Sequence, residues 1–441
     1  MAIEVASDGV ARAVSREARR SPPLKAIVVG SIGNLVEWYD FYSYAAFSLY
    51  FSGSFFPSAD PLSQQLSASV LFAAGFLMRP IGSWVFGNFT DRYGRRSCLL
   101  ASVLAMGIGS LIIAVTPTYA TIGLAAPLLL TFDRLVQGIS LGGEYGISAA
   151  YLCELADERR RGLFSSFQYV TIIGGQLSAI LVLLILQRYA LTPEELKAWG
   201  WRIPFALGAV LAALSMVMRR QLNEPELFVK ARRSSAAGSF FSFLRYPREV
   251  LLVVGLTMGG TAAFYTYTIY MQKFLKLSVH LGDGETTTLT AMSLVLAMLL
   301  QPLYGAVSDR IGRRPLLIAF GAAGTIFTIP ILTALQASHS IVSAFLLIAA
   351  AWLILSGYTA ASAVVKAELF PTRVRATGVG VPYAITLALF GGTVEPIALW
   401  LKSIGSENWF YFYLTGCIAV SLIVYLLMRD TWKTSAMAQP E

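Results

Sequence analysis

The chain has 441 residues, of which 56% are hydrophobic and only 13% are charged, and its mean hydropathy is +0.63. Soluble globular domains carry about 25% charged residues, so this composition excludes an ordinary water-soluble fold. The formal net charge is +9, but the basic residues are spread over many short segments. This distribution argues against nucleic acid as a partner.

Apolar stretches as long as a membrane-spanning helix recur along the whole chain. The sequence predicts twelve of them, near residues 25–51, 66–90, 97–117, 121–152, 162–187, 202–220, 249–274, 287–308, 315–336, 341–367, 374–401 and 409–428. A lone helix satisfies its backbone hydrogen bonds within lipid and an open sheet does not. We therefore expect an all-α membrane protein with twelve transmembrane helices.

Basic residues orient these spans. Most of the 34 Lys and Arg residues fall in the N-terminal tail or in alternate connections, Lys366 among them, whereas Lys273 and Lys402 fall on the other side. Cytoplasmic segments of membrane proteins carry this excess, so both termini are expected to be cytoplasmic. The three cysteines show no metal-ligand spacing, and we expect no metal site and no cofactor.

A ten-residue motif occurs twice. "GNFTDRYGRR" (87–96) and "GAVSDRIGRR" (305–314) share Gly-x-x-x-Asp-Arg-x-Gly-Arg-Arg, and a Glu and an Arg seven residues apart follow each copy. An internal repeat of this length indicates two pseudo-symmetric six-helix halves. We expect these at 25–220 and 249–428, with an N-terminal tail (1–24), a linker (221–248) and a C-terminal tail (429–441).

The repeated charges lie at the expected cytoplasmic boundary. They can form a latch that opens when the halves rock, or they can be only topology signals and helix caps. The proposed latch residues are Gly87, Asp91, Arg92, Gly94, Arg95, Glu154 and Arg161 in the first half, and Gly305, Asp309, Arg310, Gly312, Arg313, Glu368 and Arg375 in the second.

The motif resembles the loop between spans two and three of the major facilitator superfamily, and "RLVQG" (134–138) resembles that superfamily's Arg-x-x-Gln-Gly pattern in span four. "GNLVEWYDFY", "AAGFLMRPIG", "GGEYG", "FQYVTIIGGQL", "WGWRIPFALGAVLA", "YMQKFL" and "KAELFP" resemble the metabolite:proton symporter branch, its α-ketoglutarate carriers above all. The resemblance covers about residues 25–405. Tyr93 stands where some relatives have a histidine, so no role of that histidine carries over.

The resemblance implies a monomeric transporter in the cytoplasmic membrane of a bacterium. Its partners would be the lipid bilayer, protons and a small organic anion, and it would import a dicarboxylate, α-ketoglutarate first, with protons by alternating access. Citrate or a zwitterion such as proline or betaine remains an alternative substrate. Drug export is disfavoured because "VTIIGGQLSAI" lacks the proline typical of exporters.

Two functions from other classes lack support in the sequence. No nucleophile elbow, phosphate-binding loop or HExxH pattern indicates an enzyme. A nontransporting sensor would need a signalling domain, for which the expected tails are short.

Few ionisable side chains interrupt the spans, and such groups are functional candidates by default. Both histidines fall in expected outer loops, so a carboxylate must carry the proton. The candidates are Glu37, Asp40, Asp133, Glu144 and Glu395, which the sequence does not rank, and the resemblance implies a coupling role for Arg134.

Arg79 is the guanidinium in the middle of span two. Its fork of donors suits a substrate carboxylate. Alternatively it forms a permanent ion pair with Glu37 or Asp40, which helical rise places at a similar depth.

Other expected binding residues are Asn34, Gln168, Tyr265, Tyr270, Lys273 and Arg202. Lys273 lies near the outer end of span seven, where snorkelling towards water explains it more simply than binding does. Arg202 either anchors span six at the interface beside Trp199 and Trp201 or attracts the anion.

Overall fold

The computed structural model describes residues 24–434 except 94, 143, 144, 147, 148, 150, 151, 154, 155, 220–243, 339, 372 and 373. The side chains of residues 24–33, 87–99, 158, 218, 219, 433 and 434 also lie outside the description. Over the described ranges the chain forms helices and turns and no strands.

The first half contains the helices that fill the expected spans one to six. They are α2 (Leu24–Phe55), α3 (Pro61–Leu77), α4 (Arg79–Tyr93), α5 (Arg95–Val115), α6 (Tyr119–Ile122), α7 (Ala125–Leu141), η1 (Glu158–Arg160), α9 (Arg161–Ile185), η2 (Leu186–Ala190), α10 (Pro193–Ala198), η3 (Gly200–Arg202) and α11 (Ile203–Arg219).

The second half repeats this order for spans seven to twelve. Its elements are α13 (Pro247–Tyr265), η5 (Thr266–Tyr270), α14 (Met271–Leu277), α15 (Asp283–Ile311), α16 (Arg313–Gln336), α17 (Ile341–Glu368), α18 (Arg375–Thr386), η7 (Leu387–Gly391), α19 (Val394–Ser403), α20 (Asn408–Leu427) and α21 (Thr431–Thr434).

Nine helical segments of the described chain are long and apolar enough to cross a membrane. The remaining expected spans correspond to α2, which carries several polar side chains, to α5, whose apolar part is Leu100–Val115, and to α7, which ends two residues before a gap in the description. The expectation of a twelve-helix, two-half membrane protein is therefore confirmed.

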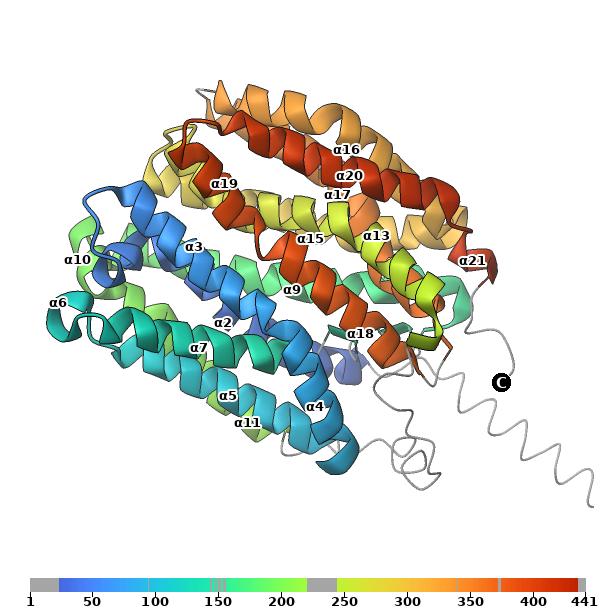
Figure 1. The fold of residues 1–441 in the computed structure, drawn as a ribbon, viewed down its shortest axis with the longest axis horizontal. Coiled ribbons are helices and arrows are strands. Elements are labelled where there is room, and N and C mark those ends of the chain that lie inside the picture. Colours follow the sequence, from blue (N-terminus) through green and yellow to red (C-terminus); the bar gives the residue numbers. More distant parts are fainter. Residues whose placement is uncertain are drawn as a thin grey trace, which may run out of the picture.

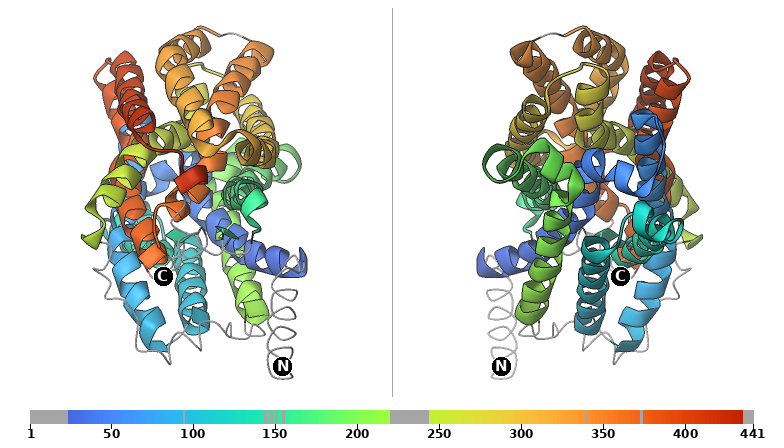
Figure 2. Two further views of the ribbon diagram at one scale, coloured as in Figure 1. Left: turned by 90° about the vertical axis from the view of Figure 1, so that its right-hand side faces the viewer. Right: turned by 90° about the vertical axis from the view of Figure 1, so that its left-hand side faces the viewer.

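The two halves lie side by side (Figure 1). Helices α5, α7 and α11 form one side of the molecule and α16 and α20 the other, while α9 and α15 pack against each other between them. Views along the bundle separate the blue-to-green helices from most of the yellow-to-red ones (Figure 2). Contacts between α9 and α15, α9 and α17, α3 and α19, and α4 and α18 join the halves.

The outer surface is apolar, as lipid requires, and polar groups are turned inward. Large hydrophobic side chains such as Val115, Leu128 and Ile326 are exposed, whereas Asp40, Arg134 and many other polar residues are buried. Polar groups buried within a bundle of this kind mark substrate or ion pathways.

Several spans depart from regular α-helix. Span two is divided between α3 and α4 next to Arg79, where Pro80 has no N–H to donate. Spans five, seven and eleven each contain a π-helical turn, η2, η5 and η7. Such turns are rare and occur often at functional sites.

Candidate functional site

Backbone contact between α7 and the α3–α4 junction positions Arg79. A Cβ atom added at Gly138 would overlap the carbonyl oxygen of Gly75, and one added at Gly142 would overlap that of Arg79. The Ser83 hydroxyl donates a hydrogen bond to the Gly142 carbonyl across the same contact. Glycine is therefore required where these helices touch, and the close contact fixes the backbone that carries Arg79.

Aromatic rings surround the guanidinium of Arg79. Its Cζ atom lies 4.2 Å from the centroid of the Phe76 ring, 4.6 Å from that of Phe41 and 5.2 Å from that of Trp38. The side chain is only 3% exposed. Its Nε and Nη2 atoms have no hydrogen-bond partner among the described residues. Cation–π contacts hold the charge without using up the donors that a carboxylate needs.

Arg79 does not form the ion pair with Glu37 or Asp40 that the sequence allows as an alternative. No salt bridge joins Arg79 to Glu37 or to Asp40, all three of which are described. Asp40 instead accepts a hydrogen bond from Gln137.

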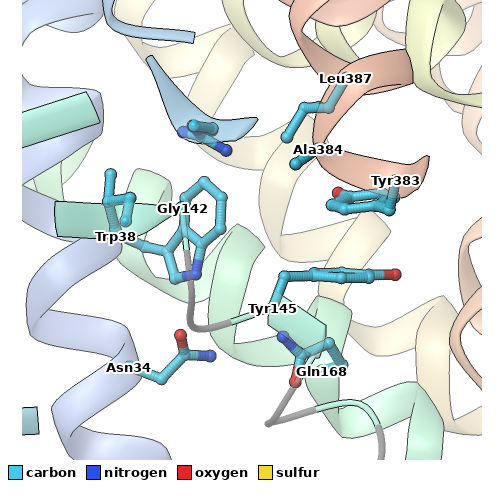
Figure 3. Close-up of a pocket in the computed structure, with 10 residues that line it drawn as sticks. Asn34, Trp38, Gly142, Tyr145, Gln168, Tyr383, Ala384 and Leu387 are labelled. Carbon is cyan, nitrogen blue, oxygen red and sulfur yellow. The ribbon is translucent and has the colours of Figure 1, made fainter. Parts of the chain in front are cut away.

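A narrow pocket lies beside Arg79 at the boundary of the halves (Figure 3). It is lined by Asn34, Trp38, Arg79, Leu141, Gly142, Tyr145, Gln168, Tyr383, Ala384 and Leu387. Three of the expected binding residues, Asn34, Arg79 and Gln168, therefore share one site. The Asn34 amide also donates a hydrogen bond of 2.7 Å to the Thr171 hydroxyl of α9, which fixes its orientation.

A stacked pair of tyrosines that the sequence does not single out also lines this pocket. The rings of Tyr145 and Tyr383 lie 3.6 Å apart between centroids and are nearly parallel, at 13°. Tyr145 follows α7 in the first half and Tyr383 belongs to α18 in the second, so the stack crosses the boundary. Figure 3 shows the two hydroxyl groups pointing in opposite directions, that of Tyr145 away from Trp38.

The sequence does not single out Lys366 either, because its position near the end of a span groups it with the cytoplasmic loop charges. It is fully buried near the end of α17. Its Nζ lies 3.3 Å from the Tyr145 hydroxyl and 3.5 Å from the Ser362 hydroxyl. It also lies 4.3 Å from the centroid of the Tyr383 ring.

The snorkelling interpretation of Lys273 is wrong, because the side chain is fully buried. Its Nζ forms a salt bridge of 2.6 Å with Glu395 of α19 and donates a hydrogen bond of 3.1 Å to the Ala45 carbonyl of α2. Glu395 is thus the partner of a cation, and the pair contacts the first half.

The remaining expected binding residues lie outside the pocket lining. Tyr265 packs its ring edge-on against Phe76, at 5.0 Å between centroids, which brings it next to the Arg79 cluster. The Tyr270 hydroxyl donates to Glu407 at 3.2 Å. Arg202 donates a hydrogen bond of 3.0 Å to the Thr116 carbonyl and lies over the Trp201 ring, remote from the pocket lining.

A second buried cluster contains the carboxylates of spans one and four. Asp133 and Arg134 form a salt bridge of 3.5 Å, and the guanidinium of Arg134 lies 4.4 Å from the centroid of the Tyr44 ring. Gln137 donates to Asp40 at 3.2 Å. Each of these ionisable side chains is at most 3% exposed. We call Asp40, Asp133, Arg134 and Gln137 the carboxylate cluster.

Two glycines leave space for this cluster. A Cβ atom at Gly208 of α11 would lie 2.5 Å from Asp40 Oδ1, and one at Gly109 of α5 would overlap Asp133 Oδ1. Glu144, another expected proton carrier, lies outside the described residues.

The repeated motif of the second half joins the two halves at one end of the bundle, here called the motif end. Asp309 of α15 accepts hydrogen bonds from the backbone N–H groups of Gly162 (2.8 Å) and Leu163 (2.9 Å) in the first turn of α9. Arg313 forms salt bridges with Asp309 (3.1 Å) and Glu368 (3.4 Å).

Two glycines of the motif allow backbone geometry that a larger residue would disturb. Gly305 lies against Gly162, where a Cβ atom would come within 2.8 Å of the Gly162 carbonyl oxygen. Gly312 ends α15 with φ +94°, a conformation that favours glycine. Arg310 is exposed, and Arg375 donates to the carbonyls of Ala367 and Phe370.

Much of the first copy of the motif lies outside the described residues. Gly94 and Glu154 lie outside the described residues, as do the surroundings of Gly87 and the side chains of Asp91, Arg92 and Arg95. Arg161 begins α9, whose next two N–H groups bind Asp309.

The two halves touch each other at both ends of the bundle. Asp309 joins α15 to α9 at the motif end. At the opposite end Lys273 and Gln272 donate to the carbonyls of Ala45 (3.1 Å) and Ala46 (3.3 Å) in α2. The halves are therefore held together at the motif end and at the opposite end in the same structure.

Comparison with known sequences gives a consistent match. The family model described as "Sugar (and other) transporter" matches residues 26–245 and 226–441. The chain is 49% identical to the alpha-ketoglutarate permease of Escherichia coli (strain K12), over 92% of this chain and 94% of that protein. It is 34% identical to the citrate-proton symporter of Klebsiella pneumoniae, over 85% and 84% respectively.

Solved structures share the fold. The proton:xylose symporter XylE bound to 6-bromo-6-deoxy-D-glucose aligns with a TM-score of 0.75 at 18% identity, over 93% of this chain and 96% of that one. The inward open conformation of XylE from E. coli gives 0.72 at 19% identity, over 94% and 98%. The matched proteins are transporters, not enzymes. The chain therefore belongs to the sugar (and other) transporter family and has the major facilitator fold.

Proposed function

We propose that this protein imports a small organic dicarboxylate, α-ketoglutarate first among the candidates, together with protons. The observation that carries the proposal is Arg79, a buried guanidinium that lines the central pocket with two hydrogen-bonding nitrogen atoms unpartnered among the described residues. The 49% identity to the alpha-ketoglutarate permease supports this substrate above citrate or a zwitterion.

Arg79 would bind one substrate carboxylate through two parallel N–H···O bonds. The neighbouring amides of Asn34 and Gln168 would position the rest of the molecule, since both line the same pocket. Trp38 closes the side of the pocket next to Arg79 and excludes water, which strengthens the charge-assisted bonds.

The carboxylate cluster would carry the proton. Asp40 and Asp133 supply two negative charges when ionised and Arg134 only one positive charge, so these three groups together have one excess negative charge in a buried position. Burying an uncompensated charge is costly, and one proton removes it. Gln137 would hold Asp40 in place as its charge changes.

Transport would proceed by rocking of the two halves, 25–220 and 249–428, about the pocket. Asp309 and Arg313 would act as the latch at the motif end, and Lys273, paired with Glu395, would close the opposite end through its hydrogen bond to the Ala45 carbonyl of the first half. The protein would act as a monomer in a bacterial inner membrane with both termini in the cytoplasm, which matches the positive-inside distribution of Lys and Arg.

Uptake by purified protein in proteoliposomes tests the proposal. Labelled α-ketoglutarate should accumulate under an inward proton gradient and not under a sodium gradient alone. Unlabelled citrate, proline and betaine should compete less well than α-ketoglutarate. Accumulation driven by sodium without a proton gradient would contradict proton coupling. Stronger competition by citrate or proline than by α-ketoglutarate would show that the competitor is the preferred substrate.

A further inference from the structure

Two buried cations next to the pocket differ in their partners from three other buried cations. Arg134, Lys273 and Arg313 each form a salt bridge with a carboxylate. Arg79 and Lys366, in contrast, have aromatic rings around them and no salt bridge to any described carboxylate. Burial of a positive charge without a negative partner is costly, so both sites favour a ligand that brings negative charge.

The two cations come from different halves of the protein. Arg79 begins α4 in the first half, and Lys366 belongs to α17 in the second. Arg79 lines the pocket directly. Lys366 lies 4.3 Å from the centroid of the Tyr383 ring, and Tyr383 lines the same pocket. The second cation therefore contacts an aromatic ring that lines the pocket.

That ring is part of a contact that rocking must change. Tyr145 and Tyr383 stack at 3.6 Å across the boundary between the halves, and Lys366 also contacts the Tyr145 hydroxyl at 3.3 Å. The pocket in this structure is too narrow for a ten-atom dicarboxylate. Separation of the stacked rings would widen the pocket on the side of Lys366.

We propose that Lys366 binds the second carboxylate of the substrate, while Arg79 binds the first, after Tyr145 and Tyr383 separate. The ammonium group then exchanges aromatic and hydroxyl contacts for a carboxylate. This inference rests on the proposed function, and it deepens it: one cation from each half makes the site selective for dianions. A monoanion would satisfy only one of the two cations.

The test compares ligands that differ by one charge. Equilibrium binding in nanodiscs is measured for α-ketoglutarate and for its two monomethyl esters, each of which lacks one carboxylate charge. In the wild-type protein each ester should bind about tenfold to a hundredfold more weakly than the dicarboxylate, the range expected for loss of a charged hydrogen bond.

Lys366→Gln assigns the second contact. It should weaken α-ketoglutarate binding to the level of the better ester and leave the binding of that ester unchanged. Lys366→Met, of similar length and suited to the aromatic surroundings, is a second variant should the glutamine not fold. Lys402→Gln is the matched control, because Lys402 pairs with Glu407 away from the pocket, and it should keep the wild-type preference for the dianion.

The outcomes separate the inference from the proposed function. Wild-type protein that binds α-ketoglutarate and both esters equally has no second cation contact, which overturns the inference alone. A folded Lys366 variant that keeps the preference for the dianion, or that loses dicarboxylate and ester binding equally, also overturns it. Absence of α-ketoglutarate binding by the wild-type protein would instead contradict the proposed substrate.

Discussion

Asp309 in the second half accepts a hydrogen bond of 2.8 Å from the backbone N–H of Gly162 in the first half. Gly162 lies in the first turn of α9, where N–H groups have no partner within the helix and the helix dipole is positive. A carboxylate at this place is therefore stabilised by both the hydrogen bonds and the dipole. The contact holds the motif end closed.

Asp309→Asn should weaken this closure and slow transport. The asparagine loses the charge, and its amide group offers one oxygen to two N–H donors, which costs about 1 kcal/mol or more. Substrate affinity should stay within about twofold of wild type because the pocket residues are unchanged. Exchange rates in proteoliposomes and equilibrium binding in nanodiscs measure the two effects.

Asp283→Asn is the control, since Asp283 pairs with Lys276 at the opposite end and is half-exposed. It should leave exchange unchanged. Loss of equilibrium binding in a well-folded Asp309→Asn protein would show that Asp309 is not only part of the closure.

Arg79→Lys should lower substrate affinity by about tenfold or more, since an ammonium cannot form two parallel bonds with one carboxylate. Arg79→Gln combined with Glu37→Gln should not restore binding, because no salt bridge joins the two residues. A double-mutant cycle on affinity checks both, with a thermal melt to confirm folding. Recovery of affinity in the double variant would return Arg79 to a structural role.

Asp40→Asn should separate transport from the proton gradient. The amide keeps a partner for Gln137 but removes the excess negative charge of the carboxylate cluster. We expect exchange of internal for external substrate to continue and uphill accumulation driven by a proton gradient to be lost. Accumulation equal to wild type would remove Asp40 from the list of proton carriers.

Gly138→Ala should destabilise the protein by about 1–3 kcal/mol, because the added methyl group overlaps the Gly75 carbonyl and forces α7 away from α3. Gly416→Ala is the control, since nothing lies within 4 Å of an added Cβ in α20. Thermal melts in detergent compare the two. An unchanged melting temperature for Gly138→Ala would mean that the helices are not in backbone contact there.

The sequence predicts the fold well because lipid imposes long apolar spans and the duplicated motif marks the halves. It also finds Asn34, Arg79 and Gln168, since a polar group in an apolar span is conspicuous. It does not find Tyr145 and Tyr383, because tyrosine occurs both in cores and at membrane interfaces and only the packing of α18 against the other half decides between them.

Buried lysines near the ends of spans are also difficult to predict from the sequence. Lys366 lies two residues before the end of α17, and Lys273 lies four residues before the end of α14, so each can be assigned to a loop or interface. Burial depends on neighbouring helices from the other half, which local hydropathy does not report. Only for Lys273 does the sequence weakly indicate burial, because its span also contains several polar residues.

The π-helical turns determine which way some of these side chains face. A π turn holds one residue more than an α turn, so side chains beyond it are rotated by about 100° relative to an uninterrupted α-helix. Lys273 lies three residues after η5 and Glu395 four residues after η7, and the two meet at 2.6 Å. Conversion of either π turn to α would twist one partner away from the other about its own helix axis. Loss of this pair would free the lysine that donates to the Ala45 carbonyl of the first half, so the two π turns bear on the contact between the halves at the end opposite the motif.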